Sequence, residues 1–230
     1  MSYTTIDNPE LYHQTKIYSG DGNDDRNIVF DVTDTTMQPD WLWSARRDSG
    51  DNLSIYDSVR GDGKELRTGS TGAELDRTNN IQALQSNGFQ VGDDGQVNAS
   101  GGTYVSWAWA AGGSASSNSN GSITSSVSAN TTAGFSIISY TGTGSAATIG
   151  HGLGAVPAWY FIKQRNTTGG WIVYHKGNTS SPETDYLRLD KNDATVDDAI
   201  FNDTAPTSSV FSIGTNAPVN TNGGTYIAYC

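Results

Sequence analysis

The sequence predicts an all-β protein made of two tandem antiparallel β-sandwich modules that are related by internal duplication. The main observation is a repeat: residues 97–108 and 219–230 share Val-Asn-x-x-Gly-Gly-Thr-Tyr, followed by an aliphatic, a small and an aromatic residue. Further matches fall in the same order in both halves of the chain. In addition, short runs of strand-forming residues alternate with turn residues, and no segment of ten residues shows helical periodicity with caps.

Most matched positions are aromatic, branched or glycine, the residue types that build strands and turns. The expected structural anchors pair Trp41 with Trp159, Tyr56 with Tyr174, Phe89 with Phe211 and Tyr104 with Tyr226, together with Trp43 and Trp107 of the first copy. The charged residues mostly do not match. This pattern favours a duplicated scaffold with divergent loops over a duplicated catalytic site.

Strands are expected wherever branched and aromatic residues stand between turn residues. In the first module they are residues 16–18, 27–32, 40–46, 53–59, 64–67, 88–92 and 103–111. Gly61-Asp62-Gly63 is a tight turn that joins two of these strands as a hairpin. Residues 68–79 are expected to form a polar loop, with Ile81 and Leu84 anchoring a turn beneath it.

The domain boundaries follow from composition. The first module is expected over residues 1–111 and the second over residues 134–230. Between them, residues 112–133 consist mainly of Gly, Ser, Asn, Thr and Ala. This composition is typical of a flexible linker. A β arm that crosses to the neighbouring module or subunit is the alternative, because the stretch aligns with residues 1–16.

The charge and composition exclude several classes of protein. The net charge of −11 is the opposite of what a phosphate-binding surface needs, so nucleic acid is not an expected partner. No stretch approaches the roughly 18 apolar residues of a membrane span. Cys230 is the only cysteine, so the chain has neither an internal disulfide framework nor zinc-type spacing. The N-terminal residues lack the basic and apolar regions of a signal peptide, and synthesis in a cytoplasm is expected.

Four stretches carry a resemblance to a known family. They are residues 8–22, 38–43, 56–61 and 86–92, and residues 136–144 with 150–154 resemble the second module of the same family. The chain resembles a repeat family found in tail fibres and other virion proteins of marine tailed phages. The resemblance implies a lectin-like, jelly-roll-like β-sandwich on a virion surface, and it carries over no catalytic or ligand residue. Because that family's second module continues past its Tyr-Cys pair, the strand ending at Cys230 is expected to be completed by another chain or by further sequence.

An enzyme is not expected. None of the three histidines, His13, His151 and His175, stands in a zinc or nucleophile motif. A glycosidase would need two carboxylates across a sugar. Candidate acids are present at Asp57, Asp62, Glu65 and Asp185, but no spacing selects a pair from the 24 acidic residues.

One loop resembles the start of a calcium site. Asp21, Asn23 and Asp25 have the alternate spacing of calcium ligands, but Arg26 stands where an EF-hand has glycine and no glutamate follows at the twelfth position. A solvated acidic turn is therefore the favoured interpretation, with weak calcium binding as the alternative. No cofactor is expected.

Sugar binding by aromatic side chains is the remaining candidate chemistry. Five of the six tryptophans lie in strand-like alternation or at matched positions, where burial in a core is the more frequent outcome. Trp171 follows two glycines and has no aromatic counterpart, so it is expected to be exposed. His151, which lies between glycines, and His175, which stands where the first module has Asp57, complete the candidate ligand residues.

These observations predict a non-enzymatic virion protein. The first hypothesis is a tail-fibre or receptor-binding component whose loops contact the host surface, with a host-surface glycan as partner. The alternative is a capsid decoration or adaptor protein that fixes neighbouring virion subunits. Other virion proteins are expected partners in both cases, and a homo-oligomer, a trimer by analogy with the family, is the expected assembly.

Overall fold

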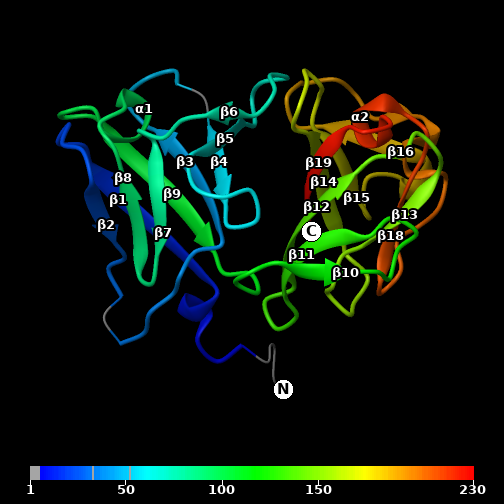
Figure 1. Cartoon of the computed structure of the whole chain (residues 1–230), viewed down its shortest axis with the longest axis horizontal. Helices are drawn as coiled ribbons and strands as arrows, with labels where there is room; N and C mark the ends of the chain where they lie inside the picture. The colour runs from blue at the N-terminus through cyan, green and yellow to red at the C-terminus, as the bar shows by residue number, and fades with distance from the viewer. Residues whose placement is uncertain (1–5, 33, 52) are drawn as a thin grey trace. The chain divides into compact units, whose positions relative to one another are not determined.

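The computed structural model describes residues 6–32, 34–51 and 53–230, and it is an all-β structure with several antiparallel sheets (Figure 1). Its contacts divide the chain into two compact units. Unit 1 comprises the described residues up to Arg67 together with Leu75–Gly113, and unit 2 comprises Thr68–Glu74 and Ser114–Cys230. The short segment Thr68–Glu74 therefore belongs to unit 2, although the strands on either side of it belong to unit 1.

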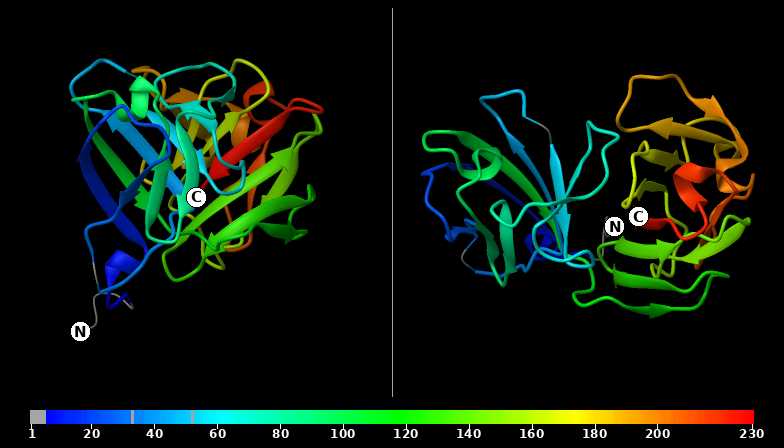
Figure 2. Two further views of the ribbon diagram at one scale, coloured as in Figure 1. Left: turned by 60° about the vertical axis from the view of Figure 1, so that its left-hand side comes forward. Right: turned by 45° about the horizontal axis from the view of Figure 1, so that its top comes forward.

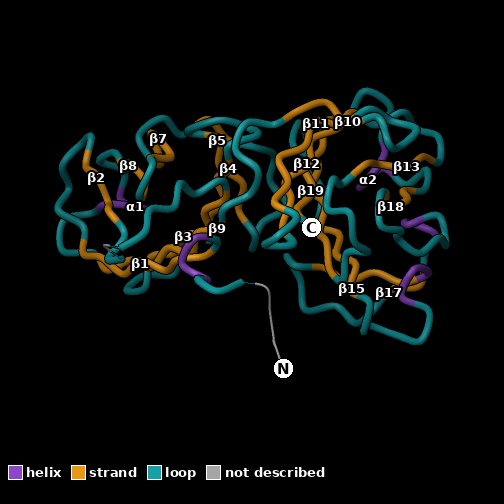
Figure 3. Tube along the Cα trace, turned by 90° about the horizontal axis from the view of Figure 1, so that it is seen from below, coloured by secondary structure: helices purple, strands orange, loops and turns teal. Residues whose placement is uncertain are grey.

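In the described part of unit 1, a six-stranded sheet and a three-stranded sheet enclose one core (Figures 1 and 2). The larger sheet has the order β1(His13–Ser19), β9(Thr103–Trp109), β3(Trp41–Arg46), β4(Ser54–Asp57), β5(Lys64–Arg67), β6(Leu75–Asp76). The smaller sheet has the order β2(Arg26–Val29), β8(Gly88–Val91), β7(Ile81–Gln85). Two short helices complete the unit: η1(Pro9–Leu11) precedes β1, and α1(Gly95–Asn98) lies in the connection between β8 and β9 (Figure 3).

Unit 2 has an eight-stranded and a two-stranded sheet within its described residues. The larger sheet has the order β10(Ser116–Asn118), β11(Ser125–Asn130), β12(Phe135–Thr141), β19(Thr225–Tyr229), β14(Trp159–Gln164), β15(Ile172–His175), β16(Asp185–Arg188), β17(Val196–Asp197). The smaller sheet pairs β13(Ala147–Gly150) with β18(Val210–Ile213), and the short helices are η2(Pro182–Thr184), η3(Ala199–Phe201) and α2(Ala217–Asn220). The described helices are all too short to cross a membrane.

Matched tyrosines occupy matching register positions in the two units. Tyr18 of β1 lies opposite Tyr104 of β9, with ring centroids 5.1 Å apart and rings inclined by 19°. Tyr140 of β12 lies opposite Tyr226 of β19, with centroids 5.0 Å apart and an angle of 12°. All four rings are buried, because the inward positions of both strand pairs carry them into the core of their own unit.

Two segments differ from the sequence-based expectation. Residues 112–133 carry β10 and β11, which extend the large sheet of unit 2, so they are not the flexible linker of the first expectation, for which a β arm was the alternative. Ile123 and Val127, isolated in the sequence, are buried in the core of unit 2, which explains how so polar a segment is held. Residues 81–85, expected as a turn, form β7, whose register shifts at a bulge between Ile81 and Ala83.

The tryptophan anchors do not all lie in a core. Trp41 is buried, but Trp43 and Trp107 are half-buried and Trp159 is 43% exposed. In β9, Tyr104 and the small residues that alternate with the tryptophans take the buried positions. The expectation of a core location was therefore wrong for Trp43, Trp107 and Trp159, and also for Trp109, which is half-buried. Alternation places Trp107 and Trp109 on the face of β9 opposite Tyr104, whereas Trp159 is exposed at the first position of β14.

Candidate functional site

In both units, the asparagine side chain of the repeated Val-Asn motif forms hydrogen bonds to the main chain of a distant turn, an arrangement that we call the asparagine lock. In unit 1, Oδ1 of the buried Asn98 accepts from the main-chain N–H of Asp21 at 3.1 Å, and Nδ2 donates to the main-chain oxygen of Asn23 at 2.7 Å. In unit 2, Oδ1 of the buried Asn220 accepts from the N–H of Thr143 at 2.8 Å, and Nδ2 donates to the oxygen of residue 145 at 2.6 Å. Both amides are thus occupied in closing a turn.

The tyrosine of the same motif fastens the short helix that precedes it. The hydroxyl of Tyr104 donates to the main-chain oxygen of Gly95 at 2.7 Å and accepts from the N–H of Ala99 at 2.8 Å. The hydroxyl of Tyr226 donates to the main-chain oxygen of Ala217, the first residue of α2, and accepts from the N–H of Thr221, which follows the helix, each at 2.7 Å. The asparagine and tyrosine side chains of the repeated motif are thus bonded within the fold and have a structural role in both units.

The proposed calcium loop is occupied by protein donors. The carboxylate of Asp21 accepts from the N–H of Asn23 at 2.9 Å and from Nδ2 of Asn98 at 3.2 Å, and Nε of Arg26 lies 3.4 Å from it. The N–H of Asn23 is also the main cause that lowers the pKa of Asp21. Asp25 adopts a left-handed conformation with φ of 55° at the turn. In the described ranges, no cluster of three or more acidic, histidine or cysteine side chains is placed to hold a metal ion.

His151 and Trp171 are both fully buried. One ring nitrogen of His151, Nε2, lies 3.1 Å from the main-chain oxygen of Thr207, and Nδ1 accepts from the N–H of Leu153 at 3.2 Å. Burial lowers the pKa of His151, so the neutral ring organises a loop. The expectation that Trp171 is exposed was wrong: its ring lies 5.7 Å from that of Phe161, and its main-chain N–H donates to Oδ1 of Asp190 at 2.7 Å.

His175 is exposed at the end of β15, directly opposite Trp159. Its Nδ1 accepts from the N–H of Gly177 at 3.1 Å. The three candidate ligand residues therefore lie in separate surroundings, with two buried and one at the surface. The exposed aromatic neighbour of His175 is Trp159, a residue that the sequence assigned to the core.

The candidate carboxylates divide into buried and exposed groups. Asp57 is buried with Arg60, whose main-chain N–H and guanidinium both donate to it. Glu65 is fully buried and accepts from the hydroxyl of Ser54 at 2.5 Å and from Nε of Arg67 at 3.2 Å. These bonds stabilise the β4–β5 hairpin. Burial raises the pKa of Asp62 at the turn, and in unit 2 Asp185 accepts from the hydroxyl of Thr179 on the surface.

An aromatic hollow on the outer face of the large sheet of unit 1 is the candidate functional site. Trp43, Leu53, Trp107 and Trp109 line a cavity of about 220 Å³. Trp43 and Trp107 lie opposite each other on β3 and β9, with ring centroids 6.1 Å apart. The signal that could have located this hollow is Trp-x-Trp on two strands, which period two places on one face of the sheet. We call these four residues the tryptophan hollow.

The chemistry of the tryptophan hollow suits a ring with an apolar face. Indole rings provide a large apolar surface at low cost in conformational entropy, and they stack on flat partners. The three indoles are half-buried, so part of each ring is open to solvent. Next to the hollow, the His13 ring lies 4.3 Å from that of Trp109, and burial lowers the pKa of His13.

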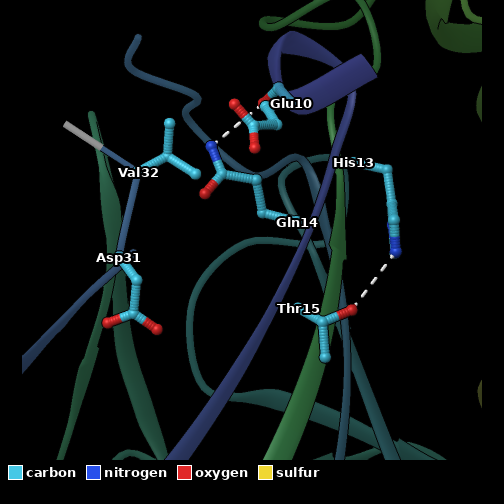
Figure 4. Close-up of a pocket in the computed structure, with 6 residues that line it drawn as sticks. All are labelled: Glu10, His13, Gln14, Thr15, Asp31 and Val32. Atoms are coloured by element: carbon cyan, nitrogen blue, oxygen red, sulfur yellow. Dashed lines mark hydrogen bonds between the residues drawn. The ribbon is translucent and has the colours of Figure 1, made fainter. Parts of the chain in front are cut away.

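A second, polar hollow of about 200 Å³ lies along β1 and is drawn in Figure 4. Its lining residues are Glu10, His13, Gln14, Thr15, Asp31 and Val32. Figure 4 shows Gln14 reaching toward Glu10, whose main-chain oxygen accepts from Nε2 of Gln14 at 2.9 Å. Asp31 is paired with Lys16. Nε2 of His13 lies 3.3 Å from the hydroxyl of Thr15, as Figure 4 also shows.

Comparison with known proteins gives a family but no function. No curated protein and no solved structure matches the chain. A family model described as a domain of unknown function, DUF7483, matches residues 8–230 and so extends through both units. The chain therefore belongs to the DUF7483 family.

Proposed function

We propose that the chain is a non-enzymatic structural protein of a phage virion, and that it serves as a tail-fibre or receptor-binding component. In this proposal the tryptophan hollow of unit 1 contacts a glycan on the host surface. The hollow is the single observation that carries the glycan contact, because it is an open aromatic surface that the core of unit 1 does not use. The virion setting is supported by the sequence resemblance alone.

We also propose that the two units arose by duplication of one β-sandwich module. Support comes from bonds that recur at matched positions. Asn98 and Asn220 close equivalent turns, and Tyr104 and Tyr226 fasten equivalent short helices. Such recurrence accounts for the repeated motif without any shared catalytic role.

A neutral pyranose fits the tryptophan hollow better than an ionic ligand. Nearly all of the exposed lining belongs to indole and leucine carbons, and among the described residues no charged side chain lines the hollow. A sugar ring presents C–H groups on one face, and that face can replace water over an indole. Hydroxyls at the ring edge would remain solvated or meet Thr15, which lies opposite Trp107.

The experiment measures attachment of the purified full chain to host cells and to their isolated surface polysaccharide. We expect Trp107→Ala to weaken binding about tenfold, which corresponds to about 1.4 kcal/mol of lost stacking. Val29→Ala, an exposed apolar position on the other sheet, is the matched control and should bind like the wild type. Trp107→Phe keeps a ring at the site and should fall between the two. Equal binding by all variants would refute the role of the hollow.

Decoration of a capsid is the second candidate function. It is favoured by exposed branched side chains, because Ile17 is 59%, Val29 51% and Val156 60% exposed, and neighbouring subunits commonly cover such residues. A protein that co-purifies with capsids and fails to attach to host cells would favour this function. Light scattering measures the oligomeric state, for which we propose a homotrimer by analogy with fibre proteins.

A further inference from the structure

An exposed tryptophan marks a second candidate site, in unit 2. Trp159 begins β14 and is 43% exposed, and it lies directly opposite His175 of β15. The corresponding register pair in unit 1 is Trp41 and Asp57, which are 3% and 1% exposed. The same place in the two sheets is therefore closed in unit 1 and open in unit 2.

Hydrogen bonds of Asp57 accompany the burial of the Trp41–Asp57 pair in unit 1. Asp57 accepts from the main-chain N–H groups of Val59 and Arg60, at 3.0 and 2.8 Å, and pairs with the Arg60 guanidinium. These bonds fold the turn after β4 onto the strand end. In unit 2 His175 stands in place of the aspartate. Nδ1 of its ring accepts from the N–H of Gly177 at 3.1 Å, and its main-chain oxygen accepts from the N–H of Asn178 at 2.9 Å.

The hydrogen bond made by Nδ1 of His175 determines which ring nitrogen can donate to a ligand. Because Nδ1 accepts the Gly177 N–H, the neutral ring carries its proton on Nε2. The ring is exposed, so Nε2 can donate to a ligand. A ligand placed over Trp159 would meet this donor, since the two residues are direct cross-strand neighbours with Cβ atoms about 5 Å apart.

Lys176 adds a positive charge beside this pair. Its main-chain N–H donates to the oxygen of Ala158 at 2.9 Å, which holds residue 176 beside the residue that precedes Trp159. The side chain is exposed, and no described carboxylate forms an ion pair with it. The exposed pair of Trp159 and His175 thus offers an indole face and an imidazole donor, and the exposed Lys176 follows His175 directly in the sequence, within reach of a ligand at the strand end.

The indole itself is held in place. The Trp159 ring packs at 4.9 Å from the Phe161 ring, with the two planes inclined by 34°. Phe161 is buried, so it supports the indole from the protein side while Trp159 keeps almost half of its surface exposed. A fixed ring loses little conformational entropy when a ligand stacks on it.

We propose that Trp159, His175 and Lys176 form a second carbohydrate site that binds a carboxylate-bearing sugar. The ring of the sugar stacks on Trp159, and its carboxylate accepts from Nε2 of His175 and from the Lys176 ammonium group. This proposal rests on the proposed glycan-binding function and extends it, because the two units then recognise sugars of different charge. The tryptophan hollow takes a neutral ring and the unit 2 site takes an acidic one.

The test uses the full chain and a glucuronate-containing tetrasaccharide, with its carboxyl-reduced form as the uncharged probe. Affinity is measured by isothermal titration calorimetry for the wild type and every variant. In the chains that retain Trp159, its indole N–H resonance in the NMR spectrum, assigned by its absence in Trp159→Ala, locates the bound tetrasaccharide. We expect Trp159→Ala to abolish measurable binding and Lys176→Gln to weaken it about fivefold, the loss of one charge-assisted hydrogen bond at the surface. Lys191→Gln, at an exposed lysine of unit 2, should have no effect.

Three results would overturn the proposal: equal affinity for the acidic and the reduced tetrasaccharide, acidic binding that survives in Trp159→Ala, or no shift of the Trp159 resonance with the acidic tetrasaccharide. Trp107→Ala removes the tryptophan hollow of unit 1 and leaves the unit 2 site intact. It therefore distinguishes failure of the unit 2 site from failure of the proposed function of the hollow. If neutral glycan binding is absent while the acidic tetrasaccharide still shifts the Trp159 resonance, the unit 2 site stands and the role of the tryptophan hollow fails. Absence of any shift with the acidic tetrasaccharide rejects the unit 2 site itself.

Discussion

The ammonium group of Lys163 donates a hydrogen bond to the main-chain oxygen of Thr71, 3.2 Å away. Thr71 belongs to residues 68–74, which we call the inserted segment because it is part of unit 2 but lies between two strands of unit 1. Lys163 is fully buried and also donates to the main-chain oxygens of Gln164 and Gly169, at 3.1 and 2.7 Å. The buried ammonium group thus donates to three main-chain oxygens, and one of them, that of Thr71, belongs to the inserted segment.

The inserted segment is also held by an ion pair whose loss should destabilise unit 2. Arg165 donates to both carboxylate oxygens of Glu74, through Nε and Nη2, each at 2.9 Å. We expect Glu74→Gln to lower the free energy of unfolding by about 1–3 kcal/mol, because the pair is bidentate and mostly buried. Urea unfolding measures the change. Asp76→Asn, which breaks an exposed pair with Lys64, is the control and should cost less than about 0.5 kcal/mol.

The buried state of Lys163 predicts a dependence of stability on pH. Desolvation lowers its pKa from 10.5 to about 8. Between these values the unfolded chain binds a proton that the folded chain does not, so the free energy of unfolding should rise with pH. We expect the stability of the wild type relative to Lys163→Met to increase from pH 8 to pH 10.5 and to stay level below pH 7. A flat difference in urea unfolding over the whole range would contradict this assignment.

The asparagine locks should be important for stability in both units. Asn98→Ala and Asn220→Ala each remove a buried amide and leave main-chain groups without their partners. We expect each change to lower the free energy of unfolding by about 2–3 kcal/mol, as measured with urea. Asn222→Ala, an exposed position in the same motif, should change stability by less than about 0.5 kcal/mol. A loss confined to one of the two buried asparagines would show that the locks are not equivalent in energy.

Cys230 should react slowly in the folded chain. It packs against the core of unit 2, and burial raises the pKa of its thiol. Since the thiolate is the reactive form, we expect its reaction with a disulfide reagent at pH 8 to be at least about tenfold slower in the folded than in the urea-unfolded protein. Stopped-flow absorbance measures both rates. A native rate equal to the unfolded rate would place the thiol in solvent.

The tryptophan hollow shows where sequence reasoning stops. Alternation in residues 103–109 correctly predicted that Trp107 and Trp109 share a face. It did not say which face the core would take, because both faces of β9 carry apolar residues. The stacked pair of Tyr18 and Tyr104 occupies the core side, and the tryptophans therefore lie on the other side.

By itself the sequence determined the all-β class, most of the strands of unit 1 and the positions of the matched tyrosines, because these depend on local alternation and turn residues. Only the tertiary structure decided that Trp171 is buried, that Trp159 is exposed and that residues 116–118 and 125–130 are strands. The physical reason is that burial depends on which distant segment covers a face. The inserted segment is the clearest example, because nothing in residues 68–74 themselves indicates that Lys163 and Arg165 will bind them.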